Sequence, residues 1–197
     1  MVHKTKHKIK QQLTILISFV AVFWLLEIID IVIFGGNLDR FGIRPTRING
    51  LWGIPLAPFL HGGLGHLIAN TIPFLILGWL VMVQRIRDFW LVTILATLIG
   101  GLGIWLFGAP NSVHIGASIL IFGYLGFLLS RGLFQGNPAS IALTVVTFLL
   151  YGHMIWGILP GVPHISWQGH LFGFLGGVFS ARVISQNGKK DNTDKWV

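Results

Sequence analysis

Residues 13–34 read LTILISFVAVFWLLEIIDIVIF and decide the class of the protein. A helix needs about 20 mostly apolar residues to cross the hydrocarbon core of a bilayer, and this run is long enough. The run is also longer than the apolar core of a signal peptide, and it lacks a convincing small-x-small cleavage site. We therefore expect a transmembrane helix that stays on the mature protein.

Five further apolar runs follow along the chain. They cover residues 66–83, 89–107, 116–129, 139–159 and 167–184. The chain of 197 residues is 53% hydrophobic and 10% charged, a composition that excludes an ordinary soluble domain. The sequence thus predicts an all-α, polytopic membrane protein built as a bundle of six transmembrane helices.

The basic residues, which give a formal net charge of +8, lie beside the predicted spans. Lysine and arginine accumulate in the cytoplasmic segments of membrane proteins, whereas the turns around Pro110 and Pro160 to Pro163 carry no charge. This pattern places both termini in the cytoplasm and argues against nucleic-acid binding. The residues that set the orientation are Lys4, Lys6, Lys8, Lys10, Arg85, Arg87, Arg131, Arg182, Lys189, Lys190 and Lys195.

The same pattern divides the chain into three parts. Residues 1–12 are expected to form a basic cytoplasmic tail, residues 13–186 the membrane domain, and residues 187–197 a second cytoplasmic tail. Within the domain, residues 35–65 are expected to be an ordered loop at the outer membrane surface.

Few residue types are available for catalysis inside this domain. The chain has six acidic residues and no cysteine, so disulfides and thiolate chemistry are excluded. The His-Glu-x-x-His string of zinc proteases is absent, and only Asp30 is available where an aspartyl protease needs two aspartates. Hydroxyl-based nucleophilic catalysis remains.

Ser118 is the candidate nucleophile, in the stretch His114-Ile115-Gly116-Ala117-Ser118-Ile119. Small residues before a serine allow close backbone approach, and a helix N-terminus presents unpaired N–H donors that suit an oxyanion. Because a serine needs an adjacent base, a partner must come from another span.

His170, in the last predicted span, is the candidate base. It lies beside glycines that recur at every fourth residue, a spacing that lets two helices pack closely. If the fourth and sixth spans pack in this way, Ser118 and His170 can come within hydrogen-bond reach as a dyad. The glycines expected at the contact are Gly116, Gly123 and Gly126 of one span and Gly173 and Gly177 of the other.

His66 and Asn70 are four residues apart at the start of the second span and share one helical face. Both side chains can donate hydrogen bonds, so they are candidates for an oxyanion hole that the backbone N–H of Ser118 would complete. All four polar residues fall in the outer half of the membrane under the predicted topology.

Two other interpretations compete with this one. A metal site could use His61, His66 and His170, because imidazole is the commonest metal ligand, but a convincing carboxylate is missing. An ion or proton pathway could use Glu27, Asp30 and the histidines, but it does not explain the Gly-Ala-Ser helix start, and the sequence has no internal repeat. Separately, an arginine of the first loop could pair with Asp30 or Glu27.

The motifs resemble those of the rhomboid family of intramembrane serine proteases, over roughly residues 13–184. The family's His-x-x-x-Asn pair is similar to His66 and Asn70, its Gly-x-Ser to Gly116 and Ser118, and its Gly-His-x-x-Gly to Gly169, His170 and Gly173. His61 matches the histidine five residues before the first motif. Two residues depart from the family pattern: Ile119 follows the serine where the family has glycine, and Phe122 stands where the family often has a tyrosine that stacks on the catalytic imidazole.

The resemblance implies a water-filled cavity open to the outside and substrates that are transmembrane helices of membrane proteins. We expect Ser118 and His170 to be catalytic, and His61, Gly116, Phe122, Gly169 and Gly173 to support the site. Neither a metal nor another cofactor is expected, and a bacterial plasma membrane is the expected location. The alternative is a catalytically inactive relative that binds or escorts transmembrane helices.

Overall fold

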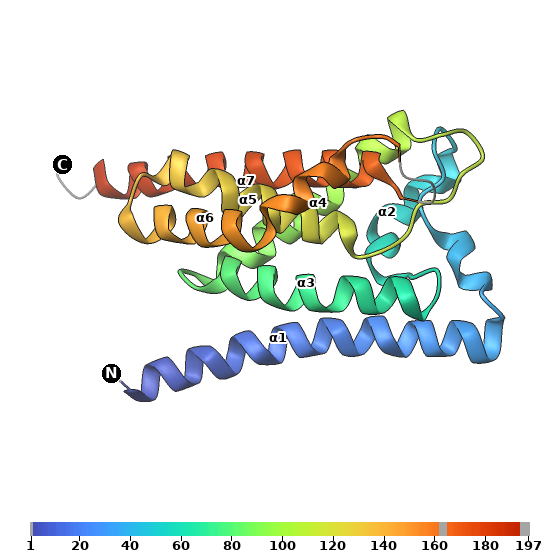
Figure 1. The fold of residues 1–197 in the computed structure, drawn as a ribbon, viewed down its shortest axis with the longest axis horizontal. Helices are drawn as coiled ribbons and strands as arrows, with labels where there is room; N and C mark the ends of the chain where they lie inside the picture. The colour runs from blue at the N-terminus through green and yellow to red at the C-terminus, as the bar shows by residue number, and fades with distance from the viewer. Residues whose placement is uncertain (1, 162–164, 194–197) are drawn as a thin grey trace.

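The computed structural model describes residues 2–161 and 165–193, and the regular structure in these ranges is helical (Figure 1). The α-helices are α1 (Val2–Ile29), α2 (Gly53–Leu56), α3 (Leu64–Met82), α4 (Ile86–Phe107), α5 (Ser118–Gln135), α6 (Pro138–Tyr151) and α7 (Trp167–Thr193). Shorter π or 3-10 turns are η1 (Asp30–Phe34), η2 (Asn37–Phe41), η3 (Ile48–Trp52), η4 (Ala57–Phe59) and η5 (Gly152–Ile158). Pro163, in the predicted last outer turn, and Lys195 lie outside the described residues.

Within the described ranges, five helical segments are long and apolar enough to cross a bilayer, as expected of a helical membrane protein. They are Thr5–Phe34, Leu64–Met82, Ile86–Phe107, Ser118–Gln135 and Pro138–Ile158. Helix α7 is not among them, because Gln168, His170, Ser180 and Arg182 interrupt its apolar residues. The sixth predicted span coincides with α7, and its membrane crossing stays a prediction.

The helices run past several boundaries expected from hydropathy. Helix α1 begins at Val2 and takes in the predicted basic tail, and α7 extends to Thr193, within the predicted second tail. Helix α5 continues to Gln135 and ends where Gly136 adopts a φ of 66°. Hydropathy marks only the apolar part of a helix, whereas the backbone hydrogen bonds continue through polar residues until a residue leaves the helical conformation.

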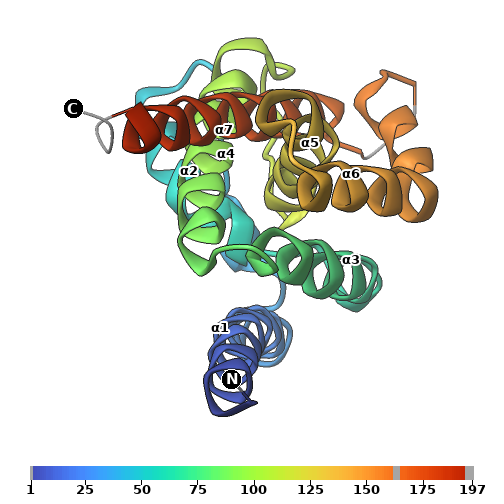
Figure 2. The ribbon, with the colours of Figure 1, turned by 90° about the vertical axis from the view of Figure 1, so that its left-hand side faces the viewer.

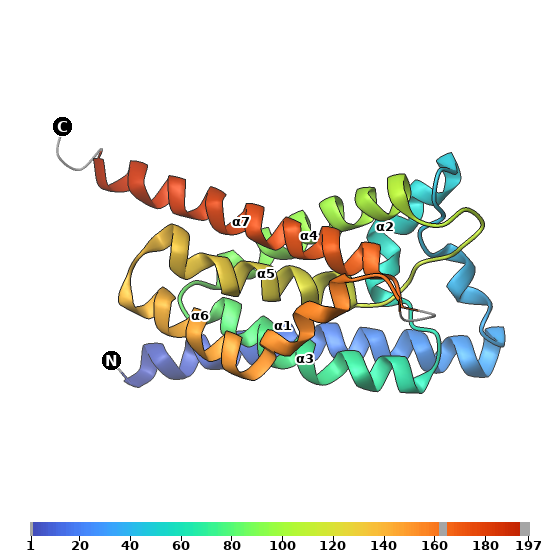
Figure 3. The ribbon, with the colours of Figure 1, turned by 45° about the horizontal axis from the view of Figure 1, so that its top comes forward.

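Helix α5 lies at the centre of the bundle (Figures 2 and 3). It contacts α3, α4, α6 and α7, and 67% of its span is buried. Helix α1 lies at the periphery and packs against α3, and the start of α1 and the end of α7 lie at the same end of the molecule (Figure 1). The predicted nucleophile therefore begins the most buried of the five candidate spans.

Glycines let α5 and α7 pack with their backbones in contact. Gly177 lies against the Gly123 carbonyl, and Gly126 lies against the Phe174 carbonyl, so that a side chain at either position would overlap the backbone of the other helix. This part of the predicted packing is confirmed. The prediction for Gly116 was wrong: this residue faces α3, where an added Cβ would lie 2.6 Å from His66 Cε1.

The long first loop is ordered and is joined to the segment that leads into α5. The backbone N–H of Ile43 donates to the His114 carbonyl and the N–H of His114 donates to the Ile43 carbonyl, both at 2.9 Å. The Gly116 N–H donates to the Ala57 carbonyl at 2.8 Å. These three bonds fix the backbone that precedes Ser118.

The acidic residues near the end of α1 are not paired with arginine. The Leu38 N–H donates to Asp30 Oδ1 at 2.9 Å, and the ion pairs between described residues involve neither Asp30 nor Glu27. The prediction that a loop arginine pairs with one of these acids was therefore wrong, because a backbone donor already satisfies the Asp30 carboxylate.

A buried ion pair lies at the end of the bundle away from this loop. Arg131 on α5 and Asp88 in the first turn of α4 are both fully buried, with Nη2 and Oδ2 3.7 Å apart. Arg131 Nη2 also donates to Gln84 Oε1 at 2.6 Å, and Arg85 pairs with Asp88 at 3.2 Å. The pair therefore links α5 to α4 and to the turn before α4.

Candidate active site

A cavity of about 980 Å³ lies between α3, the segment before α5, η5 and the start of α7. Ser118, His170, His66 and Asn70 all line it, although they come from three helices far apart in the sequence. The tertiary structure therefore brings the four predicted reacting residues to one place. The other polar residues of the lining are Ser112, His114, Ser166 and Gln168.

Ser118 is the first residue of α5 and is partly exposed. Two residues earlier, Gly116 has a φ of 113°, a backbone conformation that residues with a Cβ rarely adopt. This turn brings the chain to the helix start beside His66 and Asn70. The Ser118 N–H belongs to the first turn of the helix, where backbone donors have no intrahelical acceptor.

The His170 ring is held on two sides. Its Nδ1 lies 2.9 Å from the Gly157 carbonyl oxygen, and its ring stacks on Phe122 with centroids 4.0 Å apart and planes 8° apart. Because a carbonyl can only accept, Nδ1 must carry the proton, and Nε2 of the neutral ring is then left with a lone pair. Among the hydrogen bonds between described residues, none joins Ser118 Oγ to His170.

His66 and Asn70 line the cavity one turn apart on α3. His66 Nδ1 accepts from the Gly62 N–H at 3.4 Å, which leaves the proton of the neutral ring on Nε2. Asn70 is 7% exposed, and its Nδ2 has no hydrogen-bond partner among the described residues. An added Cβ at Gly116 would lie 2.7 Å from His66 Nε2 and 3.5 Å from Asn70 Nδ2, so both donors adjoin the turn before Ser118.

Ile119, the residue that departs from the family pattern, is buried against glycines of two neighbouring helices. An added Cβ at Gly100 of α4 would lie 2.6 Å from Ile119 Cγ2, and one at Gly169 of α7 would lie 3.4 Å from Ile119 Cγ1. Gly173 packs against the Ile119 carbonyl. The larger side chain after the serine thus fits because its neighbours lack side chains.

His61 lies outside the cavity lining. Its ring is 1% exposed and packs 5.4 Å from the Phe23 ring and 5.3 Å from the His66 ring. Burial, together with repulsion from His66, lowers the pKa of His61 to about 4. Within the described ranges no group of three or more His, Cys, Asp or Glu side chains is arranged to hold a metal ion, and Glu27 and Asp30 do not line the cavity.

Sequence reasoning missed two features of the site. The group that orients His170 is a backbone carbonyl, that of Gly157 in η5, so no pattern of side chains in the sequence could identify it. The second feature is a pair formed by His114 and Ser166, whose Nδ1 and Oγ lie 2.6 Å apart. His114 lay near the serine in the sequence, but its partner is about 50 residues away along the chain.

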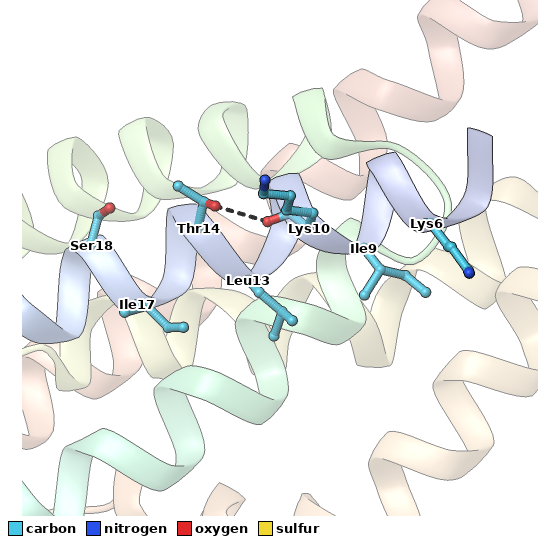
Figure 4. A pocket seen from close by; sticks show the side chains of 7 residues that line it. All are labelled: Lys6, Ile9, Lys10, Leu13, Thr14, Ile17 and Ser18. Atoms are coloured by element: carbon cyan, nitrogen blue, oxygen red, sulfur yellow. Dashed lines mark hydrogen bonds between the residues drawn. The ribbon is translucent and has the colours of Figure 1, made fainter. Parts of the chain in front are cut away.

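A second hollow, of about 470 Å³, lies on one side of α1 (Figure 4). Its seven lining residues all come from that helix: Lys6, Ile9, Lys10, Leu13, Thr14, Ile17 and Ser18. The Thr14 hydroxyl donates to the Lys10 carbonyl at 2.9 Å. The described lining residues include no histidine that could activate Ser18, so they do not form a second Ser-His pair.

Comparison with known proteins agrees with the motifs. The family model described as the rhomboid domain matches residues 49–187, a stretch that includes α3 to α6 and most of α7. An uncharacterised protein of Mycobacterium tuberculosis is 42% identical over 185 residues, which cover 90% of this chain and 77% of the relative. RHOMBOID-like protein 4 of Arabidopsis thaliana is 32% identical over 140 residues, covering 68% of this chain and 34% of the relative.

The rhomboid protease GluP of Bacillus subtilis is 31% identical over 172 residues, covering 84% of this chain and 33% of the relative. The match to the family model extends over more than half of the sequence, and the M. tuberculosis relative is matched over most of its own length. The chain therefore belongs to the rhomboid family.

Proposed function

We propose that the chain is an intramembrane serine endopeptidase that hydrolyses peptide bonds in or near transmembrane helices of membrane proteins. Ser118 is the nucleophile, and His170 is the general base. The observation that carries the proposal is the meeting of Ser118, His170, His66 and Asn70 in one cavity of a chain of this family. Six spans, cytoplasmic termini and a bacterial plasma membrane are parts of the same proposal.

The surroundings of His170 support its role as base. The bond from Nδ1 to the Gly157 carbonyl selects the tautomer in which Nε2 can accept the proton of Ser118 Oγ. The stack on Phe122 limits rotation of the ring. Because no acidic side chain among the described residues lines the cavity, the carbonyl takes the orienting role that an aspartate has in a triad.

The oxyanion is expected to bind Asn70 Nδ2, the His66 Nε2–H and the Ser118 N–H. A buried amide donor without a partner is costly, and a developing negative oxygen would satisfy it only during the reaction. The attack of Ser118 Oγ gives an acyl-enzyme and releases the amine with the proton from His170. Water that His170 deprotonates then hydrolyses the ester and regenerates the serine.

A substrate helix must unwind before it can react, because its peptide bonds are hidden in internal hydrogen bonds. Helices that contain glycine, proline or other weak helix formers are therefore the expected substrates. Helix α6 with η5 is the least buried of the five candidate spans, at 6%, and it contributes Met154 and Gly157 to the cavity. The substrate therefore enters when this helix, or the first loop, is displaced.

The test is cleavage of a single-span reporter protein by the purified chain in liposomes. We expect product from the wild type and none from the Ser118→Ala and His170→Ala variants, while the matched controls Ser130→Ala and His7→Ala keep wild-type activity. Both control residues lie outside the cavity lining. Equal product from all the proteins would refute the proposed dyad.

Two observations favour the non-catalytic alternative, a protein that binds or escorts transmembrane helices. The described hydrogen bonds do not include one between Ser118 and His170, and Ile119 departs from the family pattern. Catalytic hydrogen bonds are often long in enzymes without substrate, and Ile119 fits beside glycines of α4 and α7, so neither observation outweighs the shared cavity. Stable capture of the reporter by the wild type and by Ser118→Ala alike, without cleavage, would favour the alternative.

A further inference from the structure

A hydrogen-bond network joins Ser112, His114 and Ser166, which line the cavity beside the proposed dyad. His114 Nε2 lies 2.8 Å from Ser112 Oγ, and His114 Nδ1 lies 2.6 Å from Ser166 Oγ. Ser112 Oγ donates to the Ala109 carbonyl at 2.6 Å, and the Gly169 N–H donates to Ser166 Oγ at 3.3 Å. The hydrogen-bond network thus connects the segment before α5 to the first turn of α7.

The donors and acceptors of this hydrogen-bond network have one consistent assignment. Ser112 uses its proton on the Ala109 carbonyl, so its oxygen accepts from the His114 Nε2–H. His114 Nδ1 then carries the lone pair and accepts from the Ser166 hydroxyl. Burial lowers the pKa of His114, which keeps the neutral form that this assignment requires.

His114 and Ser166, the two residues joined in this network, each lie close in sequence to one residue of the dyad. His114 is four residues before Ser118, and its backbone is paired with Ile43 of the first loop. Ser166 is four residues before His170, and its carbonyl accepts from the His170 N–H at 3.1 Å. The 2.6 Å bond between the two side chains therefore connects the backbone that carries the nucleophile to the backbone that carries the base.

We propose that His114 and Ser166 are a positioning pair that sets the distance and orientation between Ser118 and His170. The proposal rests on the proposed protease function and adds two residues to it. Neither residue takes part in proton transfer with the substrate. A displacement of a reacting group by about 1 Å can cost about 100-fold in rate, so the bond acts through geometry.

The test measures kcat and KM for the single-span reporter and the rate at which a fluorophosphonate probe modifies Ser118, located by peptide mass. We expect Ser166→Ala and His114→Phe to lower kcat and the labelling rate by about 10-fold to 100-fold, with KM changed less than about twofold. Ser166→Thr, which keeps the hydroxyl, should recover most of the loss. Ser130→Ala and His7→Phe are matched controls.

The double variant distinguishes a shared bond from two separate effects. Because both changes remove the same hydrogen bond, His114→Phe with Ser166→Ala should be no slower than the slower single variant. If His114→Phe does not fold, the pair Ser166→Ala and Ser166→Thr still carries the test. Wild-type rates in Ser166→Ala, a raised KM with unchanged kcat, or the absence of rescue by Ser166→Thr overturns the proposal.

Three further outcomes separate this proposal from the proposed function. A probe attached to Ser166 instead of Ser118 would mean that Ser166 is the nucleophile and His114 its base, and it would overturn the positioning role. A wild type that neither cleaves the reporter nor is labelled at Ser118 would overturn the protease function and this inference with it. Labelling of wild type and variants at equal rates overturns the inference alone.

Discussion

The rings of His170 and Phe122 are stacked, with centroids 4.0 Å apart and planes 8° apart. The Phe122→Leu variant keeps apolar volume but removes the stacked ring. A stacked aromatic pair contributes about 0.5–1.5 kcal/mol, so kcat for the single-span reporter should fall by about 2-fold to 12-fold without a change in KM. Phe148→Leu on the exposed surface of α6 is the control, and an unchanged kcat in Phe122→Leu would contradict a role for the stack in orienting the base.

Asn70 provides a direct test of the oxyanion hole. The Asn70→Ala variant should lose about 100-fold to 1000-fold in kcat, as is typical for removal of one oxyanion donor, while KM stays nearly constant. The substitution removes no hydrogen bond of Asn70 Nδ2, because that donor has no partner among the described residues, so the variant should not lose stability for this reason. Asn49→Ala, at an exposed position outside the cavity lining, is the control. A loss of activity that follows a loss of thermal stability would argue for a structural role instead.

Gly116 should tolerate no side chain. In the Gly116→Ala variant the Cβ would lie 2.6 Å from His66 Cε1, and the φ of 113° would be strained by about 1–3 kcal/mol. We expect the midpoint of thermal unfolding in detergent to fall and cleavage of the reporter to be lost. Gly65→Ala is the matched control, because its Cβ has nothing within 4 Å and a helical glycine gains stability when replaced by alanine. Equal behaviour of the two variants would contradict the close contact of Gly116 with His66.

The buried pair of Arg131 and Asp88 is expected to be needed for folding and not for catalysis. Removal of Arg131 leaves the buried Asp88 carboxylate with the partly exposed Arg85 as its cationic partner, so Arg131→Met should lower the free energy of unfolding by at most about 3–5 kcal/mol. A double variant, Arg131→Met with Asp88→Leu, should lose less than the single variant, because no charge stays buried alone. Arg87→Ala, at an exposed position, is the control. Denaturant unfolding measures these differences, and a loss below about 1 kcal/mol in Arg131→Met would show that the pair contributes little.

Asp39 in the first loop makes stability depend on pH. Burial, with repulsion from Asp30 and Glu27, raises the pKa of Asp39 from 3.8 to about 6. The folded state therefore binds a proton more tightly than the unfolded state, and stability is lost as the pH rises through this range. The Asp39→Asn variant should equal the wild type below about pH 4, become increasingly more stable than the wild type as the pH rises from 4 to about 6, and keep that advantage above pH 6. Thermal unfolding from pH 4 to 7 measures the difference, and two parallel curves would contradict the shifted pKa.

The sequence was sufficient to predict most of the long helices and to name the candidate reacting residues. Long apolar runs have no stable alternative to a helix in a bilayer, because each backbone polar group must be satisfied internally. The candidates could also be named from the sequence, because a histidine in a membrane helix is a functional candidate by default and Ser118 lies at a predicted helix start. The glycine spacing predicted the contact of α5 with α7 at Gly123 and Gly177 but misassigned Gly116.

Only the tertiary structure decided which residues surround the reacting groups. The Gly157 carbonyl on His170, the fit of Ile119 beside Gly100 and the bond between His114 and Ser166 join positions far apart in the chain. Hydropathy and spacing describe each helix by itself, so they cannot give its rotation or depth relative to its neighbours. Packing against α5 fixes both, and it thereby decides which serine, histidine and asparagine share one cavity.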